Sequence, residues 1–221
     1  MGHERGRLIL IEGLDRTGKS TQASLLALEL TNAKVIKFPE RSTKIGAVID
    51  EYLTNEDFNL SDQSAHLLFL ANRWEVAENM TKELNNGVSL VVDRYIYSGI
   101  AYSLAKLEFY HKDSQSEMSK VDWLYAPDRG LPKPDMTLFL TLDLTELGNR
   151  KGWGEERYEK EEFQKIVKKC FFLTLKWEED DTVIILDVQG KGIDEVKQMI
   201  WDIVAKKLMN TLTNEPLHKF M

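Results

Sequence analysis

Near its N-terminus the chain reads Arg7-Leu-Ile-Leu-Ile-Glu-Gly-Leu-Asp-Arg-Thr-Gly-Lys-Ser20. The apolar run that ends at Ile11 is short and continuous, which is typical of a strand buried on both faces of a parallel sheet. A glycine-rich turn follows, and residues 21–30 then have the leucine spacing of an amphipathic helix. The stretch therefore predicts a strand, a tight loop and a helix in immediate succession.

The loop matches G-x-x-x-x-G-K-[ST] from Gly13 to Ser20. Its glycines let successive backbone N–H groups curl around a phosphate, and the next helix directs its positive N-terminus at the same anion. Lys19 can reach the β- and γ-phosphate oxygens, and the Ser20 hydroxyl can ligate Mg²⁺. The alternative is a chance glycine-rich turn, but the buried strand before the motif and the helix after it favour a P-loop. The motif indicates nucleoside-triphosphate binding and leaves the phosphoryl acceptor open.

A second polar element, Asp93-Arg94, follows the apolar run at residues 88–92. Asp93 stands at the carboxyl end of a predicted strand, the edge at which parallel sheets bind ligands. A carboxylate there can hold Mg²⁺, directly or through water, as a Walker-B aspartate does. Alternatively, Asp93 could cap the next helix with Arg94 as its ion-pair partner. The neighbouring P-loop favours the metal-binding interpretation.

Strand-like and helix-like segments alternate along most of the chain. The predicted strands are 7–11, 35–38, 88–92, 136–142 and 183–186, and the predicted helices are 21–30, 45–53, 63–84, 98–106, 163–177 and 192–208. This alternation predicts an α/β fold, with a parallel, doubly wound sheet and helices on both faces. Residues 107–134 and 149–158 break the alternation, and loops this long in a compact domain are usually functional or disordered.

Composition limits the class of protein. The 221 residues fit a single domain, alone or with a mobile appendage, and the hydrophobic share of 43% is sufficient for a core. A net charge of −7 argues against a broad basic face for nucleic acid, so a polyanion must be bound by a few aimed cations. The lone cysteine, Cys170, allows no intrachain disulfide, and no apolar run is long enough to cross a membrane. We therefore expect no nucleic-acid or membrane partner, and an intracellular location in the cytoplasm, the nucleus or both.

Six motifs together resemble the thymidylate kinases of eukaryotic type, fungal ones in particular. They are Ile11-Glu-Gly-Leu-Asp-Arg-Thr-Gly-Lys-Ser20, Phe38-Pro-Glu-Arg-Ser-Thr43, Leu67-Leu-Phe-Leu-Ala-Asn-Arg-Trp-Glu75, Asp93-Arg-Tyr95, Gly130-Leu-Pro-Lys-Pro-Asp135 and Glu156-Arg-Tyr-Glu159. Several of these motifs are not shared with other P-loop families. The resemblance extends from the first predicted strand to the last predicted helix.

The resemblance implies a P-loop NTPase-type sheet of five parallel strands flanked by helices, with a mobile lid at about residues 149–159. It also implies ATP as phosphoryl donor, dTMP as acceptor, Mg²⁺ as cofactor and a homodimer. Catalysis would involve Arg16, Lys19, Asp93 and Arg94, with Ser20 and Asp93 holding the metal. The ATP-binding residues would be Gly13, Leu14, Asp15, Arg16, Thr17, Gly18, Lys19, Ser20, Thr21 and Arg150.

For the acceptor site, the resemblance implies that Asp15 binds the 3′-hydroxyl of dTMP and that Phe69 stacks on thymine. Arg16 would stabilise charge on the transferring phosphoryl, and Arg150 would lie near the adenine. The full set of dTMP-binding residues would be Asp15, Phe38, Arg41, Phe69, Arg73, Arg94, Ser98, Gly99, Tyr102, Tyr158 and Gln164.

The residue types themselves leave simpler interpretations open. Phe69 and Arg73 share one face of a predicted helix, and such a pair is often a core phenylalanine beside a surface arginine. Arg41 could be a solvated turn residue, and Asp15 with Arg16 could form a surface ion pair of little energetic value. Arg157 could belong to a solvated charge run, or it could join Arg150 in compensating for a lost Arg16.

Other functions also remain open at this stage. The closest alternative is another nucleoside or nucleoside-monophosphate kinase, and the next is a nucleotide switch that acts through a partner. A switch needs no second nucleotide pocket. The segment 107–121 is longer than the usual connection in the resembled family, and it carries none of the motifs. We therefore expect its shortening to leave the chemistry largely intact.

Overall fold

A computed structural model describes residues 4–110, 121–147, 157–158, 160–176, 178–209 and 215–221. Five strands form one parallel sheet: β1 (Leu8–Gly13), β2 (Ala33–Lys37), β3 (Ser89–Asp93), β4 (Met136–Thr141) and β5 (Val183–Asp187). Their order across the sheet is β2-β3-β1-β4-β5, and every neighbouring pair is parallel. The predicted five-stranded parallel sheet is thus confirmed.

Strand β1 lies at the centre of the sheet because it is apolar on both sides. Its residues from Leu8 to Ile11 are fully buried, with β3 on one side and β4 on the other. A strand that pairs on both edges and is covered on both faces must be a continuous apolar run. The P-loop therefore begins at the most rigid position in the sheet.

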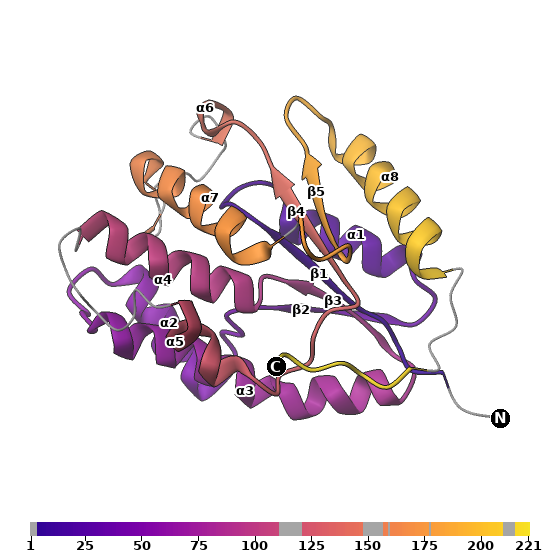
Figure 1. The fold of residues 1–221 in the computed structure, drawn as a ribbon, viewed down its shortest axis with the longest axis horizontal. Coiled ribbons are helices and arrows are strands. Elements are labelled where there is room, and N and C mark those ends of the chain that lie inside the picture. Colours follow the sequence, from indigo (N-terminus) through magenta and orange to yellow (C-terminus); the bar gives the residue numbers. More distant parts are fainter. Residues whose placement is uncertain (1–3, 111–120, 148–156, 159, 177, 210–214) are drawn as a thin grey trace.

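Helices cover the sheet in two groups (Figure 1). The first contains α1 (Lys19–Glu29) and α8 (Ile193–Val204), which pack against each other. The second contains α3 (Asp62–Asn85), α4 (Ile96–Tyr110) and α7 (Glu161–Leu175), with α4 packed between the other two. The shorter elements are α2 (Lys44–Thr54), which packs on α3, α5 (Val121–Tyr125), a 3₁₀ turn at Ala126–Asp128, α6 (Leu144–Leu147) and a π-helical turn at Ala205–Met209.

The structure corrects two expectations about the segment that follows the predicted helix 98–106. Residues 107–110 continue α4, whereas the sequence analysis assigned them to a loop. Leu107 is buried and the Phe109 ring lies 5.7 Å from that of Phe163, so packing on α7 prolongs the helix. Residues 121–128 are largely helical as well. The remaining part of the predicted extension, 111–120, and most of the predicted lid lie outside the described residues.

The sheet brings three functional segments to one edge. The carboxyl ends of β1, β2 and β3 are neighbours, since Ile11 and Lys37 both align with Asp93. The P-loop after β1, the Phe38 segment after β2 and the Asp93-Arg94 pair at the end of β3 therefore lie together. Within the described residues, no helix is both long enough and apolar enough to cross a membrane.

Candidate active site

The P-loop backbone adopts conformations that its residue types make possible. Gly13 has φ 151°, and a Cβ atom there would lie 2.5 Å from the Leu140 carbonyl oxygen of β4. Gly18 has φ 93° and forms the N-cap of α1. Both positions favour glycine, because L side chains rarely adopt such backbone angles. Arg16 also has a positive φ, 62°, so the loop holds a charged side chain on a backbone suited to glycine.

Lys19 is the buried cation of the loop. Its side chain is 5% exposed and donates a 2.5 Å hydrogen bond to the carbonyl oxygen of Leu14. Burial and the nearby Arg94 guanidinium lower the pKa of Lys19 to about 8 from its ordinary value of 10.5, although Asp93 and other carboxylates oppose the shift. A buried ammonium whose neighbouring carboxylates do not offset its burial is suited to receive a phosphate.

Ser20 and Asp93 form the expected candidate metal position. The Ser20 hydroxyl donates a short hydrogen bond to Oδ2 of Asp93, and the Lys37 ammonium lies 3.3 Å from that hydroxyl and 4.0 Å from Oδ2. Oδ1 of Asp93 is buried and has no hydrogen-bond partner among the described residues. A hydroxyl beside an unsatisfied carboxylate oxygen fits Mg²⁺, which binds few protein ligands and keeps several waters and phosphate oxygens. The described residues contain no cluster of three His, Cys, Asp or Glu side chains for an all-protein metal cage.

Asp15 is the centre of a hydrogen-bond network that joins the P-loop to α4 and α7. Arg94 donates a short hydrogen bond to Oδ1 of Asp15, while the Tyr102 hydroxyl and the Gln164 amide donate to Oδ2 at 2.7 Å and 2.9 Å. Burial opposes ionisation of Asp15, but Arg94 and Lys19 outweigh it and hold the pKa below its ordinary value. Asp15 is thus a fixed anion whose ion-pair partner is Arg94, so the alternative of a surface pair between Asp15 and Arg16 does not describe this site.

Glu12 is a buried charge that the sequence analysis did not select. Its Oε1 accepts hydrogen bonds from the backbone N–H groups of Tyr95 (2.9 Å) and Ser98 (3.0 Å), and its Oε2 accepts one from the Ser98 hydroxyl (2.6 Å). Burial raises the pKa of Glu12 despite the nearby Arg94. The sequence could have identified Glu12, because a glutamate that directly follows a buried apolar strand must find hydrogen-bonding partners inside the protein. Glu12 fixes the start of α4 against the P-loop.

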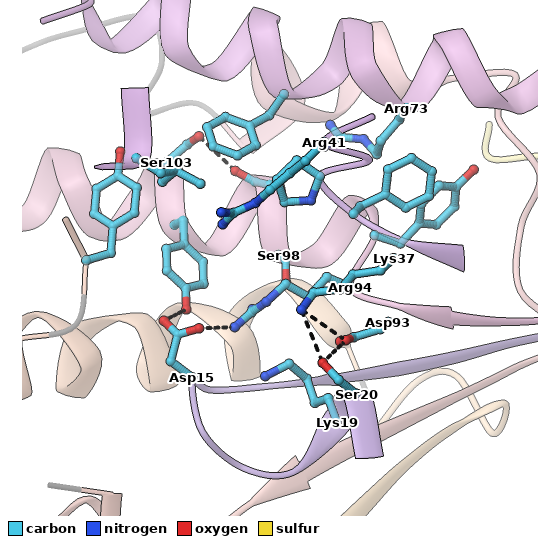
Figure 2. A pocket seen from close by; sticks show the side chains of 18 of the residues that line it. Asp15, Lys19, Ser20, Lys37, Arg41, Arg73, Asp93, Arg94, Ser98 and Ser103 are labelled. Atoms are coloured by element: carbon cyan, nitrogen blue, oxygen red, sulfur yellow. Dashed lines mark hydrogen bonds and ion pairs between the residues drawn. The ribbon is translucent and has the colours of Figure 1, made fainter. Parts of the chain in front are cut away.

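A cavity of about 550 Å³ extends from the P-loop across the sheet edge, and its size is typical of a small-molecule site. Figure 2 shows Lys19, Ser20 and Asp93 at one end and Arg41, Arg73 and Ser103 at the other, with Arg94 and Ser98 between them. The predicted residues that line the cavity are Asp15, Arg16, Gly18, Lys19, Ser20, Thr21, Phe38, Arg41, Phe69, Arg73, Asp93, Arg94, Ser98, Gly99, Tyr102 and Tyr158. One cavity therefore unites most of the predicted donor and acceptor residues.

Arg73 lies in an environment very different from that of a surface arginine. Its side chain is 3% exposed, and its Nε and Nη2 each donate a 2.8 Å hydrogen bond to the two carboxylate oxygens of Asp128. The guanidinium lies against Gly99, where an added Cβ atom would come within 2.7 Å of Nη1. The bidentate pair fixes the plane of the guanidinium, and Gly99 provides the space it needs. The sequence analysis missed Asp128.

Arg41 and Phe69 are less enclosed than Arg73. Arg41 donates a 2.5 Å hydrogen bond to Asp50 of α2, and its side chain is 39% exposed. It is therefore both a cavity residue and a partner in a surface ion pair. The half-buried Phe69 ring packs edge-on against Tyr52, with ring centroids 6.5 Å apart. Phe69 and the buried Arg73 lie one turn apart on α3, and together they are suited to binding a flat ring that carries polar groups on its edge.

Some predicted residues do not line the cavity. Gly13, Leu14 and Thr17 are buried members of the P-loop, and the Gln164 amide is hydrogen-bonded to Asp15 and Tyr102. Arg150 is outside the described residues. Conversely, the sequence analysis gave no role to several residues that do line the cavity: Lys37, Pro39, Leu53, Asp62, Ala65, His66, Tyr95, Ser103 and Lys106. Pro39 and Tyr95 belong to motifs whose other members had been given roles, and Lys37 ends β2. The remaining six carry no motif residue with an assigned role and reach the cavity through the packing of α2, α3 and α4.

Comparisons with known proteins agree with this geometry. The family model for thymidylate kinase matches residues 11–200. Curated thymidylate kinases include one from Schizosaccharomyces pombe, 43% identical over 91% of this chain and 92% of its own, and the human one, 40% identical over 98% of each. A solved thymidylate kinase structure from Candida albicans is 53% identical, with a TM-score of 0.95 over 99% of this chain and all of its own. The chain therefore belongs to the thymidylate kinase family.

Proposed function

We propose that this protein transfers the γ-phosphoryl group of ATP to dTMP, giving ADP and dTDP. The observation that carries the proposal is the shared cavity, in which the P-loop faces a second compartment formed by Phe69, Arg73 and Tyr102. A P-loop alone accounts for donor binding, whereas a kinase of this class also needs an acceptor compartment in line with the γ-phosphate. Family membership supplies the identity of the acceptor.

On the donor side, the P-loop residues from Gly13 to Thr21 would hold the phosphates of ATP through their backbone N–H groups and Lys19. The side chains of Leu14 and Thr17, together with Gly13, are buried and would contribute by fixing the shape of the loop. Arg150 would contact the adenine. Ser20 and Asp93 would hold Mg²⁺, which would supply positive charge to offset that of the phosphates.

On the acceptor side, we assign dTMP to the compartment around Phe69, with Arg73 at the edge of the base and Phe38, Ser98 and Gly99 nearby. Arg41 and Arg94 would bind the phosphate of dTMP. Asp15 would accept the hydrogen bond of the 3′-hydroxyl, and Tyr102, Tyr158 and Gln164 would enclose the sugar. Asp15 already has two donors on Oδ2, so its sugar contact would share or replace one of them.

In the reaction, an oxygen of the dTMP phosphate attacks the γ-phosphorus, and the bond to the β–γ bridging oxygen breaks. The nucleophile is already an anion, so no strong general base is required. Arg16, Lys19 and Arg94 would surround the transferring group and offset the charge on its three equatorial oxygens. The chain thus acts mainly through alignment and positive charge.

The two alternatives differ from this proposal in measurable ways. A nucleoside kinase would phosphorylate thymidine itself, and a nucleotide switch would bind no acceptor nucleotide. The buried Arg73–Asp128 pair and the aromatic lining of the second compartment favour a flat, polar-edged acceptor over a partner protein. The Candida albicans relative is described as having broad substrate specificity, so the choice of acceptor bases has to be tested directly.

A coupled assay of ADP release with dTMP, dUMP, dCMP, dGMP and thymidine tests the proposal. We expect dTMP to give the highest kcat/KM and thymidine to give no turnover. Equilibrium binding of dTMP in the absence of ATP should show a saturable site. Turnover of thymidine, or the absence of dTMP binding to a folded protein, would contradict the proposed activity.

We also propose a homodimer and an intracellular location in the cytoplasm, the nucleus or both. Leu67 and Trp74 lie two turns apart on α3 and are 41% and 42% exposed, so this helix presents an apolar strip to solvent. Such a strip is suited to self-complementary packing about a two-fold axis. The intracellular location follows from the proposed substrates, because ATP and dTMP are metabolites of the cell interior.

A further inference from the structure

Arg157, the residue before Tyr158, makes an unusual number of contacts with the end of α2. Its Nε donates to the carbonyl oxygen of Tyr52 at 3.0 Å, and its Nη2 lies within hydrogen-bond distance of the carbonyl oxygens of Asn55 (2.9 Å), Phe58 (3.0 Å) and Glu56 (3.4 Å). The guanidinium carbon also lies 4.6 Å from the centre of the Tyr52 ring. A single side chain thus binds a cluster of carbonyls a hundred positions earlier in the chain.

One of these carbonyls, that of Tyr52, belongs to the last turn of α2, and the others belong to residues that follow the helix. The last turn of a helix leaves carbonyl groups without intrahelical partners and carries partial negative charge. Helix α2 has no basic residue in its last turn. Arg157 fills this position with a planar fork that can donate to several oxygens while stacking on an aromatic ring, which a lysine ammonium cannot do.

Tyr158, the next residue, lines the cavity. Its hydroxyl lies 2.8 Å from that of Tyr52, and its ring stacks on Phe163 at 5.3 Å and packs against Tyr102 at 5.7 Å. Its carbonyl oxygen accepts a 3.0 Å hydrogen bond from the same Gln164 amide nitrogen that donates to Asp15. The chain at this point therefore connects the end of α2 to the network around the P-loop carboxylate.

We propose that Arg157 is a positioning residue for the acceptor nucleotide: it fastens the chain before α7 to the end of α2 and so holds Tyr158 against Tyr102. This inference rests on the proposed phosphorylation of dTMP. Arg157 is not among the residues that line the cavity, and among the described residues its side chain contacts the end of α2 and the turn that follows it. It therefore acts through Tyr158, and it does not substitute for Arg16 at the phosphoryl group.

The test compares Arg157→Ala and Arg157→Lys with Lys165→Ala. Lys165 also lies near the start of α7, but its ammonium only forms an exposed pair with Glu161. We expect Arg157→Ala to weaken dTMP binding without ATP by about tenfold, with kcat and the KM for ATP within about threefold of the parent. Arg157→Lys should recover little of the loss, because an ammonium cannot replace the fork. Lys165→Ala should bind both nucleotides normally.

A double-mutant cycle tests the route of the effect. If Arg157 acts through Tyr158, then Arg157→Ala should add little to the dTMP affinity already lost in Tyr158→Ala. Additive losses would show that Arg157 acts elsewhere and would overturn the inference.

Two other outcomes would also overturn it. One is a kcat lowered by about 100-fold with unchanged dTMP affinity, which would place the arginine at the transferring phosphoryl. The other is unchanged dTMP binding in Arg157→Ala or, if that variant does not fold, in a folded Arg157→Lys. Failure of the parent protein to bind dTMP would instead contradict the proposed function.

Discussion

Arg16 combines a charged side chain with a backbone angle that favours glycine. Substituting glycine for Arg16 removes the charge and preserves the loop conformation, because glycine adopts this positive φ without strain. A cation that acts on the transferring phosphoryl group is worth about 10³ to 10⁵ in rate in related enzymes. We expect Arg16→Gly to lower kcat by about 10² to 10⁴ while the KM values change little, since the interaction strengthens in the transition state.

Steady-state kinetics with both substrates varied would measure this effect, and Arg16→Lys would separate the charge from the forked geometry. The sequence analysis named Arg150 and Arg157 as residues that could compensate for a lost Arg16. Because the Arg157 side chain binds carbonyls at the end of α2 and just after it, Arg150 is the remaining candidate of the two. A kcat within a few-fold of the parent, with only the KM for ATP raised, would reduce Arg16 to a ground-state contact.

The pKa of Lys19 predicts a pH dependence of ATP binding. Between about 8 and 10.5, the folded ligand-free protein holds this proton less tightly than the unfolded chain does. The contribution of Lys19 to the free energy of unfolding therefore rises with pH across this window, because the unfolded state binds more protons. ATP phosphates favour the charged ammonium, so ATP binding should take up a proton and weaken as the pH rises above about 8.

Calorimetry in two buffers of different ionisation enthalpy would measure this proton uptake at pH 8.5. The exposed Lys165→Met variant should retain the uptake, whereas Lys19→Met should lose it along with most of the affinity for ATP. An ATP affinity that stays constant from pH 7 to 9.5 would contradict the assignment of Lys19 to the phosphates.

Asp128 fixes the position of the Arg73 guanidinium, although the two residues lie far apart in the sequence. Removing one partner of a buried ion pair costs about 3–5 kcal/mol, because the other charge stays buried without compensation. We expect Asp128→Asn to lower the Tm and to weaken dTMP binding far more than ATP binding. Glu161→Gln, which breaks the exposed pair with Lys165, is the matched control and should change neither.

If Asp128→Asn weakened ATP and dTMP equally, Arg73 would have no special connection with the acceptor. Gly99→Ala provides an independent check, because its methyl group would displace the Arg73 guanidinium without changing any charge.

At the scale of elements, α4 carries more of the site than its sequence suggested. Its first turn is fixed by Glu12, its middle contributes Gly99 and Tyr102, and its end packs on α7 through Phe109. The sequence predicted a helix over residues 98–106 but ended it too early, because the apolar residues that continue it are followed directly by a polar segment. Helix ends depend on the neighbouring element, which a local pattern does not contain.

Because residues 107–110 belong to α4, the expectation that the extension can be shortened without loss of chemistry now applies only to residues 111–120. Removing residues 113–118 should leave kcat and the KM for dTMP near the parent values, because loop length has a small energetic cost. Removing 107–110 as well should lower the Tm, since Leu107 and Phe109 pack against the rest of the protein. Thermal unfolding and the coupled assay together would measure both effects. Lost turnover in a folded 113–118 deletion would show that the segment contributes to the site.

At the scale of the whole molecule, the apolar strip on α3 predicts the oligomeric state. We expect light scattering to give a mass of twice 25.5 kDa for the parent protein. Leu67→Glu should give a monomer, because it places a charge in the interface. Leu28→Glu on α1, where the parent leucine is 82% exposed, should leave the mass unchanged. A monomeric parent would contradict the proposed dimer.

Much of the molecule follows from local sequence. The central strand, the P-loop and the number and direction of the strands were all predictable, because buried parallel strands and phosphate loops have strong local patterns. The residues that we propose for the acceptor compartment came mainly from the family resemblance, and their shared cavity supports that proposal. Asp128, Glu12 and the contacts of Arg157 were not, because each depends on partners brought together by the fold, and spacing along the chain does not indicate such partners.

The central place of β1 in the sheet has a consequence for how the protein is made. Leu8 to Ile11 leave the ribosome well before the residues of β3 with which they pair, which begin at Leu90. At about 5–20 residues per second, this delay lasts roughly 4 to 16 s, during which the apolar run has no sheet to join. A segment that is fully buried in the finished enzyme is therefore exposed during synthesis, when molecular chaperones can bind it.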